Sequence, residues 1–147
     1  KLKEISDDIF NNEPNSVLEY GITEGDNDFK EEAIKFLSRH GNIVNDYDGV
    51  MVTSGSQQIM DFMAKCLCDE GDVVVCENPS FLGALNAFKS NGVKLVGVDM
   101  DDDGINIAKL EETLKMPKKP KFIYLIPNFQ NPTGITTSLE KRKYGNS

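Results

Sequence analysis

The sequence predicts an α/β fold, in which helices alternate with the strands of a mostly parallel sheet. Short apolar runs recur along the chain, and residues with helical spacing separate them. Three of these runs end in polar connections that contain glycine or proline. Because open α/β sheets bind ligands at the carboxyl ends of their strands, these connections form the candidate site. The predicted strands are Val50–Thr53, Val73–Cys76, Lys94–Val98 and Phe122–Ile126.

The amino-terminal part predicts two helices. Leu2, Ile5 and Ile9 share one helical face, which predicts an amphipathic helix at the start of the chain. A second helix is predicted over Lys30–Arg39, with His40 at its carboxyl end.

The loop between these helices begins after Tyr20 and contains two glycines. It enters the second helix through Asp28 and Glu31, which have the spacing of a capping box. Without further context this segment indicates only a loop followed by a helix.

The first predicted strand turns into a helix through Gly55. Ser56 and Gln57 open that helix, where free backbone N–H groups, a hydroxyl and the positive end of the helix dipole favour an anion. The turn can therefore hold a phosphate. The alternative is that Ser54 or Ser56 only caps the helix. The pattern is neither a P-loop nor a G-x-G-x-x-G fingerprint, which argues against an adenine nucleotide.

The strand Val73–Cys76 leads through Pro79 to Phe81. An aromatic ring at this position can stack on the face of a flat ligand. Core packing is the alternative, because Leu85 and Phe88 follow Phe81 at helical spacing.

The last predicted strand ends in residues 127–134, PNFQNPTG. This segment brings Asn131 to the carboxyl end of a buried strand, which suggests a site. Asparagine, proline and glycine are also common turn residues, so an ordinary exit from a strand is the alternative.

Taken in order, these segments resemble the pyridoxal-phosphate-dependent aminotransferases of fold type I. Within them they are similar to the branch that includes aromatic, kynurenine and aminoadipate aminotransferases and aminotransferase-like regulators. The most specific pieces are residues 54–58, SGSQQ, and residues 131–134, NPTG. The resemblance implies a three-layer α/β/α large domain with a mostly parallel sheet. Residues 1–147 would form part of that domain, truncated at both ends and without the small domain.

The resemblance also implies a cofactor and its ligands. Gly55, Ser56 and Gln57 would hold the phosphate of pyridoxal 5′-phosphate. Phe81 would cover one face of the pyridine ring, at a position where tyrosine is common. Asn131 would hydrogen-bond the phenolic oxygen of the ring.

Tyr20 would reach across the interface of a homodimer to the phosphate bound by the other subunit. The resemblance further implies that Val73–Cys76 lies between Lys94–Val98 and Phe122–Ile126 in a parallel trio. Val50–Thr53 would then lack its usual neighbours, which belong to later parts of such a domain.

The catalytic lysine of the resembling enzymes, which forms a Schiff base with the cofactor, would follow the Asn131 loop at a greater distance than this chain extends. Lys141 and Lys143 come too early in the order of the chain. Together with Arg142 they are interpreted as the solvated basic start of a helix after Ser138. We therefore assign no catalytic residue, and we expect the segment alone to be inert.

The leading interpretation of function is thus a segment of an aminotransferase, which moves an amino group between an amino acid and a 2-oxo acid. One alternative is the effector-binding domain of an aminotransferase-like transcription regulator, which would require a DNA-binding domain before residue 1. Another is a non-catalytic phosphate-binding domain with coincidental motifs.

Composition excludes some partners. A net charge of −8 and a pI near 4.6 argue against nucleic acid or an anionic membrane, since both attract basic surfaces. No apolar run has the length of a membrane span and no signal-like start is visible, so we expect a cytoplasmic protein. Cys66, Cys68 and Cys76 have apolar neighbours and are interpreted as buried reduced thiols. No metal site is predicted, because His40 is the only histidine.

Residues 99–104, DMDDDG, match the opening of an EF-hand calcium loop. Leu110 occupies the position that requires glutamate, and Glu111 comes one residue too late. An exposed acidic turn before a helix at Ile107–Leu114 is therefore predicted instead.

Overall fold

The computed structural model describes residues 1–41, 45 and 48–144. The chain divides into two compact units, which are described separately. We call Lys1–Ser54 the amino-terminal unit and Gly55–Ser147 the carboxyl-terminal unit.

The described residues of the amino-terminal unit form three helices. Both predicted helices are confirmed, and His40 is the C-cap of the second. The predicted capping box is wrong, because the N-cap is Asp26, two residues before Asp28, and its carboxylate accepts a hydrogen bond of 2.9 Å from the Phe29 amide. The helices are α1 (Leu2–Asn12), α2 (Pro14–Leu18) and α3 (Asn27–Arg39).

The predicted strand Val50–Thr53 is wrong, because these residues have no strand structure. Instead, the Val52 amide donates a hydrogen bond of 2.9 Å to the Glu24 carbonyl in the loop before α3. A strand exists only where a neighbour completes its backbone hydrogen bonds, and no described part of this unit is a strand.

The carboxyl-terminal unit is built on a four-stranded sheet with the order β3-β2-β1-β4. Strand β1 pairs in parallel with β2 on one side and with β4 on the other, so the predicted trio is confirmed. Strand β3 pairs antiparallel with β2. The elements are α4 (Gly55–Leu67), β1 (Val73–Asn78), α5 (Leu82–Ser90), β2 (Lys94–Asp101), β3 (Gly104–Ile105), α6 (Ile107–Leu114), β4 (Phe122–Tyr124) and α7 (Leu139–Tyr144).

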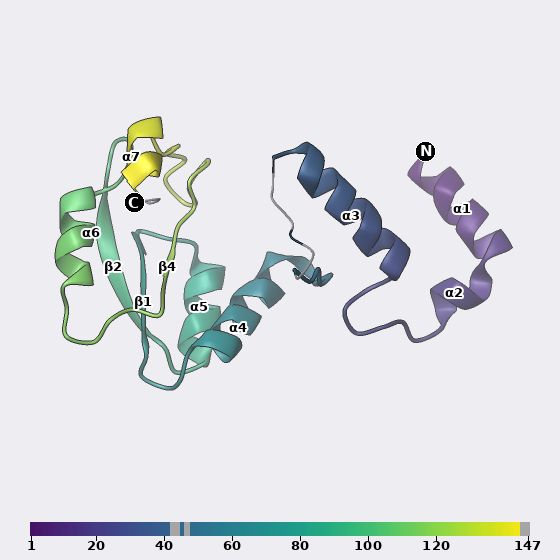
Figure 1. Ribbon diagram of the computed structural model, residues 1–147, viewed down its shortest axis with the longest axis horizontal. Coiled ribbons are helices and arrows are strands. Elements are labelled where there is room, and N and C mark those ends of the chain that lie inside the picture. Colours follow the sequence, from purple (N-terminus) through teal and green to yellow (C-terminus); the bar gives the residue numbers. More distant parts are fainter. Residues whose placement is uncertain (42–44, 46–47, 145–147) are drawn as a thin grey trace. The chain divides into compact units, whose positions relative to one another are not determined.

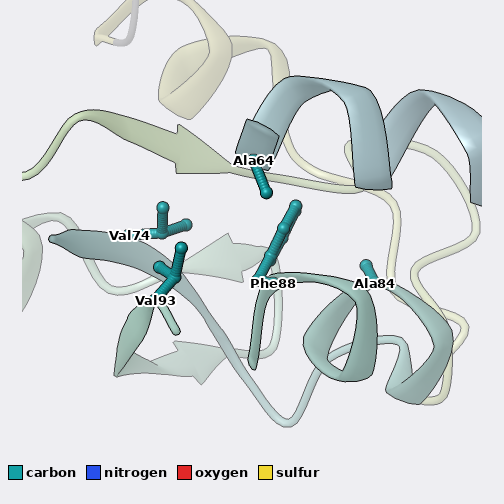
Figure 2. Close-up of a cluster of buried hydrophobic side chains, with 5 residues drawn as sticks. All are labelled: Ala64, Val74, Ala84, Phe88 and Val93. Atoms are coloured by element: carbon teal, nitrogen blue, oxygen red, sulfur yellow. The ribbon is translucent and has the colours of Figure 1, made fainter. Parts of the chain in front are cut away.

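Helices cover both faces of this sheet (Figure 1). Val74 and Val75 are neighbours in β1 and therefore point to opposite faces. Val74 belongs to a buried cluster with side chains of α4 and α5, and Phe88 lies among them (Figure 2). Val75 belongs to a second cluster, against which Ile107 and Leu110 of α6 pack. The predicted three-layer arrangement is thus present, with the central strand buried on both sides.

Strand β4 ends two residues earlier than predicted. The Ile126 amide leaves the sheet and donates a hydrogen bond of 3.2 Å to the carboxylate of Glu77. Glu77 is buried in β1, so a side chain from the central strand meets the chain where β4 has ended.

The three thiols differ in their surroundings. Cys76 is buried in β1, and burial raises the pKa of its thiol. Cys68 is half-buried, whereas Cys66 is exposed, so the expectation of burial is wrong for Cys66. Cys66 points away from the core because α4 turns Ala64 toward the sheet. Among the described residues, no helix is both long and apolar enough to cross a membrane.

Candidate functional site

Three connections of the carboxyl-terminal unit meet at the carboxyl ends of β1 and β4. The side-chain amide of Gln57, in the first turn of α4, donates a hydrogen bond of 2.8 Å to the Gly83 carbonyl in the first turn of α5. The amide of Gln130, in the loop after β4, donates one of 2.8 Å to the Pro79 carbonyl after β1. Both glutamines therefore contact one short segment, residues 79–83. The structure brings the predicted phosphate turn, the predicted stacking ring and the Asn131 loop to this segment.

The turn before α4 depends on glycine. Gly55 has a φ of +73°, which side chains with a Cβ rarely adopt, and no atom lies within 4 Å of the position of an added Cβ. Ser56 follows at the start of the helix and is exposed. The N–H groups of a first helical turn lack intrahelical acceptors, so this turn can offer donors to an anion. The Gln57 side chain already bonds Gly83, so only the Gln57 backbone N–H would be left as a donor for an anion.

Phe81 immediately precedes α5 and is half-buried. Its ring packs against the cluster around Phe88, as the core-packing alternative requires. Gly83 makes this packing possible, because an added Cβ there would lie 2.6 Å from both the Phe81 ring and the Gln57 side-chain oxygen. The half-exposed ring retains accessible surface for a flat ligand.

Ser80 was not identified from the sequence. Its hydroxyl is buried and has no hydrogen-bond partner among the described residues. Ser80 directly precedes Phe81, so an unpaired polar group lies within the connection that carries the candidate ring. The polar, proline-containing exit of the strand was the only sequence signal for it.

Asn131 is exposed at the tip of the loop that follows β4. Backbone hydrogen bonds close this loop: the Gln130 amide donates to the Ile135 carbonyl at 2.8 Å, and the Thr137 amide donates to the Pro127 carbonyl at 2.9 Å. The base of the loop is therefore fixed, while the Asn131 side chain remains available to a ligand.

Gln130 is the most buried part of the loop, with 1% of its surface exposed. Besides Pro79, its amide nitrogen donates to the Glu77 carboxylate at 3.2 Å. Its oxygen accepts hydrogen bonds from the backbone and the hydroxyl of Thr133 at 3.0 and 2.7 Å. Burial raises the pKa of Glu77, and the hydrogen bonds from Gln130 and Ile126 oppose that shift in part.

In the basic segment after Ser138, Lys143 is exposed as predicted, but Lys141 and Arg142 are not solvated. The Arg142 guanidinium donates to the Pro127 carbonyl at 2.8 Å, the Asn128 side chain at 2.6 Å and the Thr137 carbonyl at 2.9 Å. These are the two ends of the Asn131 loop. The correction has a physical reason, because loop carbonyls without ladder partners need donors and a guanidinium supplies several in a fixed plane.

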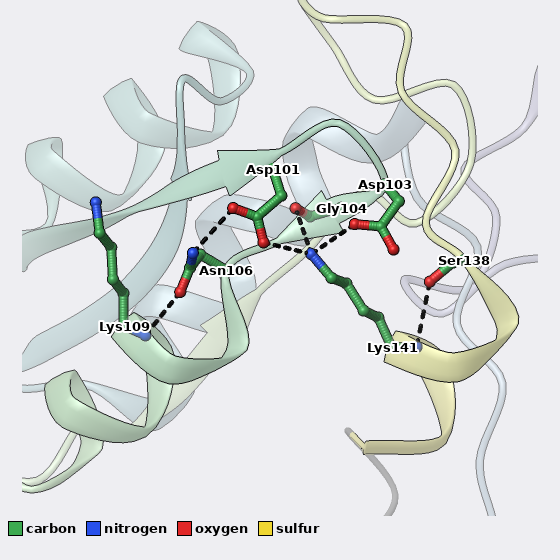
Figure 3. Close-up of polar contacts among 7 residues, drawn as sticks. All are labelled: Asp101, Asp103, Gly104, Asn106, Lys109, Ser138 and Lys141. Carbon is green, nitrogen blue, oxygen red and sulfur yellow. Dashed lines mark hydrogen bonds and ion pairs between the residues drawn. The ribbon is translucent and has the colours of Figure 1, made fainter.

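Lys141 is also held, with 14% of its side chain exposed. Its ammonium lies 2.7 Å from the Asp101 carboxylate and 2.8 Å from that of Asp103 (Figure 3). Asp101 ends β2 and Asp103 belongs to the turn between β2 and β3, so the predicted acidic turn is a hairpin that binds α7. Both carboxylates keep the pKa of the Lys141 ammonium above its usual value against the opposing effect of burial.

Tyr20 belongs to the amino-terminal unit and is exposed. The role expected for Tyr20 at an interface between subunits stays a prediction.

Fold and site together define an α/β protein with three polar connections gathered at the carboxyl ends of its parallel strands. The chain belongs to the aminotransferase class I and II family, whose model matches residues 1–143. The sequence resemblance to fold type I enzymes is thereby confirmed.

Individual relatives agree with this assignment. Aromatic-amino-acid aminotransferase 1 of Thermococcus litoralis is 35% identical over 146 residues, which cover 97% of this chain and 35% of the relative. The structure of Pyrococcus horikoshii kynurenine aminotransferase, solved in complex with PMP, is 37% identical and superposes with a TM-score of 0.88 over 97% of this chain and 36% of that one. α-Aminoadipate aminotransferase from Thermus thermophilus is 35% identical, with a TM-score of 0.83 over 97% of this chain and 35% of that one. The chain thus spans about a third of the length of the proteins it matches.

Proposed function

We propose that this chain is the segment of a pyridoxal-phosphate-dependent aminotransferase that binds the cofactor phosphate and orients the cofactor ring. The whole enzyme would transfer an amino group between an amino acid and a 2-oxo acid. The observation that carries the proposal is the convergence of the α4 turn, the Phe81 connection and the Asn131 loop on residues 79–83.

The residues present fit the cofactor. The open side of Gly55 allows a phosphate to approach the backbone, where Ser56 and Gln57 would supply N–H donors. Phe81 would lie against the ring, and Asn131 would donate to its phenolic oxygen. When bound, pyridoxal phosphate supplies an electron sink, and the protein supplies binding and orientation. In a homodimer, Tyr20 would contact the phosphate held by the other subunit.

The proposal includes a cytoplasmic location and a homodimeric full-length protein. The family supports these two statements. The alternative role, as the effector domain of a transcription regulator, is not favoured, because the relatives described above are enzymes matched over nearly the whole chain.

The test is an NMR titration with pyridoxine 5′-phosphate, which has no aldehyde and so cannot react with surface lysines. We expect the largest shifts at Ser56, Gln57, Phe81 and Asn131. Asn131→Ala should weaken binding by about two- to tenfold, the value of one hydrogen bond. The control Asn15→Ala, on an exposed position of α2, should leave the affinity unchanged. Binding that is insensitive to Asn131→Ala, or shifts confined to other surfaces, would contradict the proposal.

A further inference from the structure

Backbone hydrogen bonds and Arg142 fix the base of the Asn131 loop, but only one side chain within the loop is buried. Within residues 127–134, Gln130 is buried and every other residue is exposed. Loops with few buried contacts are the parts of a protein that open most easily. Phe129 also has a φ of +48°, a conformation that is unfavourable for residues with a Cβ. Contacts from the surrounding structure must therefore maintain this loop.

Gln130 supplies those contacts with its complete hydrogen-bonding capacity. A glutamine amide has two N–H donors and an oxygen with two lone pairs. The donors reach Pro79 and Glu77, and the oxygen accepts twice from Thr133. The amide orientation is thereby determined, because an exchange of its nitrogen and oxygen would place donors against donors at Thr133.

The partners of Gln130 belong to two different connections. Pro79 lies two residues before Phe81, and Thr133 lies two residues after Asn131. Glu77 extends the link, since the same carboxylate oxygen also accepts from the Ile126 amide at the end of β4. The buried side-chain amide of Gln130 thus joins the backbone next to Phe81 to the backbone next to Asn131.

We infer that Gln130 is a positioning residue: it holds the Asn131 loop against the connection of Phe81, so that the two groups meet a flat ligand in a fixed relation. This inference rests on the proposed function for its ligand. Gln57, and not Gln130, joins the phosphate turn to the start of α5 through Gly83. The loss of Gln130 should therefore weaken contacts with the ring and spare those with the phosphate.

The principal variant is Gln130→Met, which keeps the length of the side chain and removes all four hydrogen bonds. A second variant, Thr133→Val, changes an exposed residue and removes the hydroxyl that donates to Gln130 and accepts from the Ile135 amide, so that it folds even if the first does not. The control is Val98→Ala, which opens a cavity in the other buried cluster and reduces stability without changing the loop.

Two measurements are made on each variant of the 147-residue chain. Amide hydrogen exchange of Phe129 and Gly134 should accelerate by about tenfold or more in Gln130→Met, and less in Thr133→Val. The dissociation constant for pyridoxine 5′-phosphate should rise by about tenfold, whereas that for inorganic phosphate should change less than about twofold. Val98→Ala should not change the exchange rates of the loop amides relative to those of the rest of the chain. It should also leave the ratio of the two dissociation constants unchanged.

Unchanged loop exchange in both variants would overturn the inference. So would an equal loss of both ligands in Gln130→Met and Val98→Ala, since that result would show a structural role alone. If the unsubstituted chain binds neither ligand, the proposed function fails, and the exchange data alone then decide whether Gln130 holds the loop.

Discussion

The carboxyl-terminal unit buries Val74, Val75 and Phe88 almost completely, whereas none of the described residues of the amino-terminal unit is buried. Both units contain amphipathic helices. In the carboxyl-terminal unit, helices pack on both faces of a sheet and their apolar residues contact strands. In the amino-terminal unit, Leu2 and Phe36 remain exposed, and no strand is present among the described residues.

This difference shows what an amphipathic pattern does and does not determine. The pattern fixes which residues share a face, because the helical period is a local property. The free energy that stabilises the helix comes from packing that face against another element, and short helices without such packing are only marginally stable in water. The same amphipathic pattern therefore occurs in packed helices of one unit and in unpacked helices of the other.

The largest expected effect is a difference in hydrogen exchange between the units. Amides of β1, buried between β2 and β4, should exchange only through global opening. Amides of α1 have no buried side chains above them and should exchange more than about a thousandfold faster. Exchange resolved by NMR on the intact chain measures both. Equal protection in α1 and β1 would show that the amino-terminal helices are covered in solution and would remove the distinction.

Two phenylalanine substitutions sharpen the comparison. Phe88 in α5 is 1% exposed and contacts the rings of Phe122 and Tyr124 edge to face, at centroid distances of 5.4 and 5.5 Å. Phe88→Ala should lower the free energy of unfolding by about 3–5 kcal/mol, because it leaves a cavity between helix and sheet. The matched change Phe36→Ala, in α3 with 58% exposure, should cost less than about 0.5 kcal/mol. Urea denaturation provides both values, and similar costs would mean that Phe36 is buried in solution.

The sequence predicted the central sheet well for a related reason. Val73–Cys76 is a continuous apolar run, which is typical of a strand buried on both faces, and it lies between two parallel neighbours as expected. Val50–Thr53 has the same local character but lacks a neighbour. Local pattern cannot reveal that absence, because pairing depends on residues far away in the sequence.

In the candidate site, too, local features could be predicted from the sequence and contacts between distant residues could not. Gly55, Phe81 and Asn131 were identifiable because special turns and strand ends leave local signals. The contacts of Gln130 with Pro79 and of Arg142 with Pro127 span 51 and 15 residues, and no spacing rule predicts them. Lys141 was misinterpreted for the same reason, since its carboxylate partners lie about 40 residues earlier in the chain.

A smaller effect is expected at the rim of the carboxyl-terminal unit. Lys141→Met removes the ammonium that holds α7 to the β2–β3 hairpin, and should lower the thermal midpoint by roughly 4 °C. Lys143→Met is the matched control on the same helix, because Lys143 is exposed. The difference should shrink at high salt, since Asp101 and Asp103 remain partly exposed. Identical midpoints for the two variants would show that the ion pairs do not fix α7.

The smallest effect concerns the buried carboxyl of Glu77 and its dependence on pH. Burial raises the pKa of Glu77 above the ordinary glutamate value of 4.5. Below that value the carboxyl is protonated in both the folded and the unfolded chain and contributes no pH dependence. As the pH rises, the unfolded chain loses the proton first, so the contribution of Glu77 to stability falls until the folded carboxyl has also ionised, and is constant above.

Glu77→Gln removes this titration while it retains an oxygen that can accept from Ile126 and Gln130. The stability of the variant relative to the parent should therefore increase from pH 4.5 upward and then level off. Lowered carboxyl pKa values, such as that of Asp72 beside Asp69 and Lys118, make both proteins less stable in acid and cancel in the difference. A constant cost from the new amide shifts the whole curve without changing its slope. Urea denaturation of both proteins between pH 4 and 7.5 gives the difference directly, with Glu4→Gln in α1 as the exposed control. A difference in the free energy of unfolding that does not depend on pH would mean that water reaches Glu77. The carboxyl-terminal unit would then be packed less tightly around the candidate site than in its core.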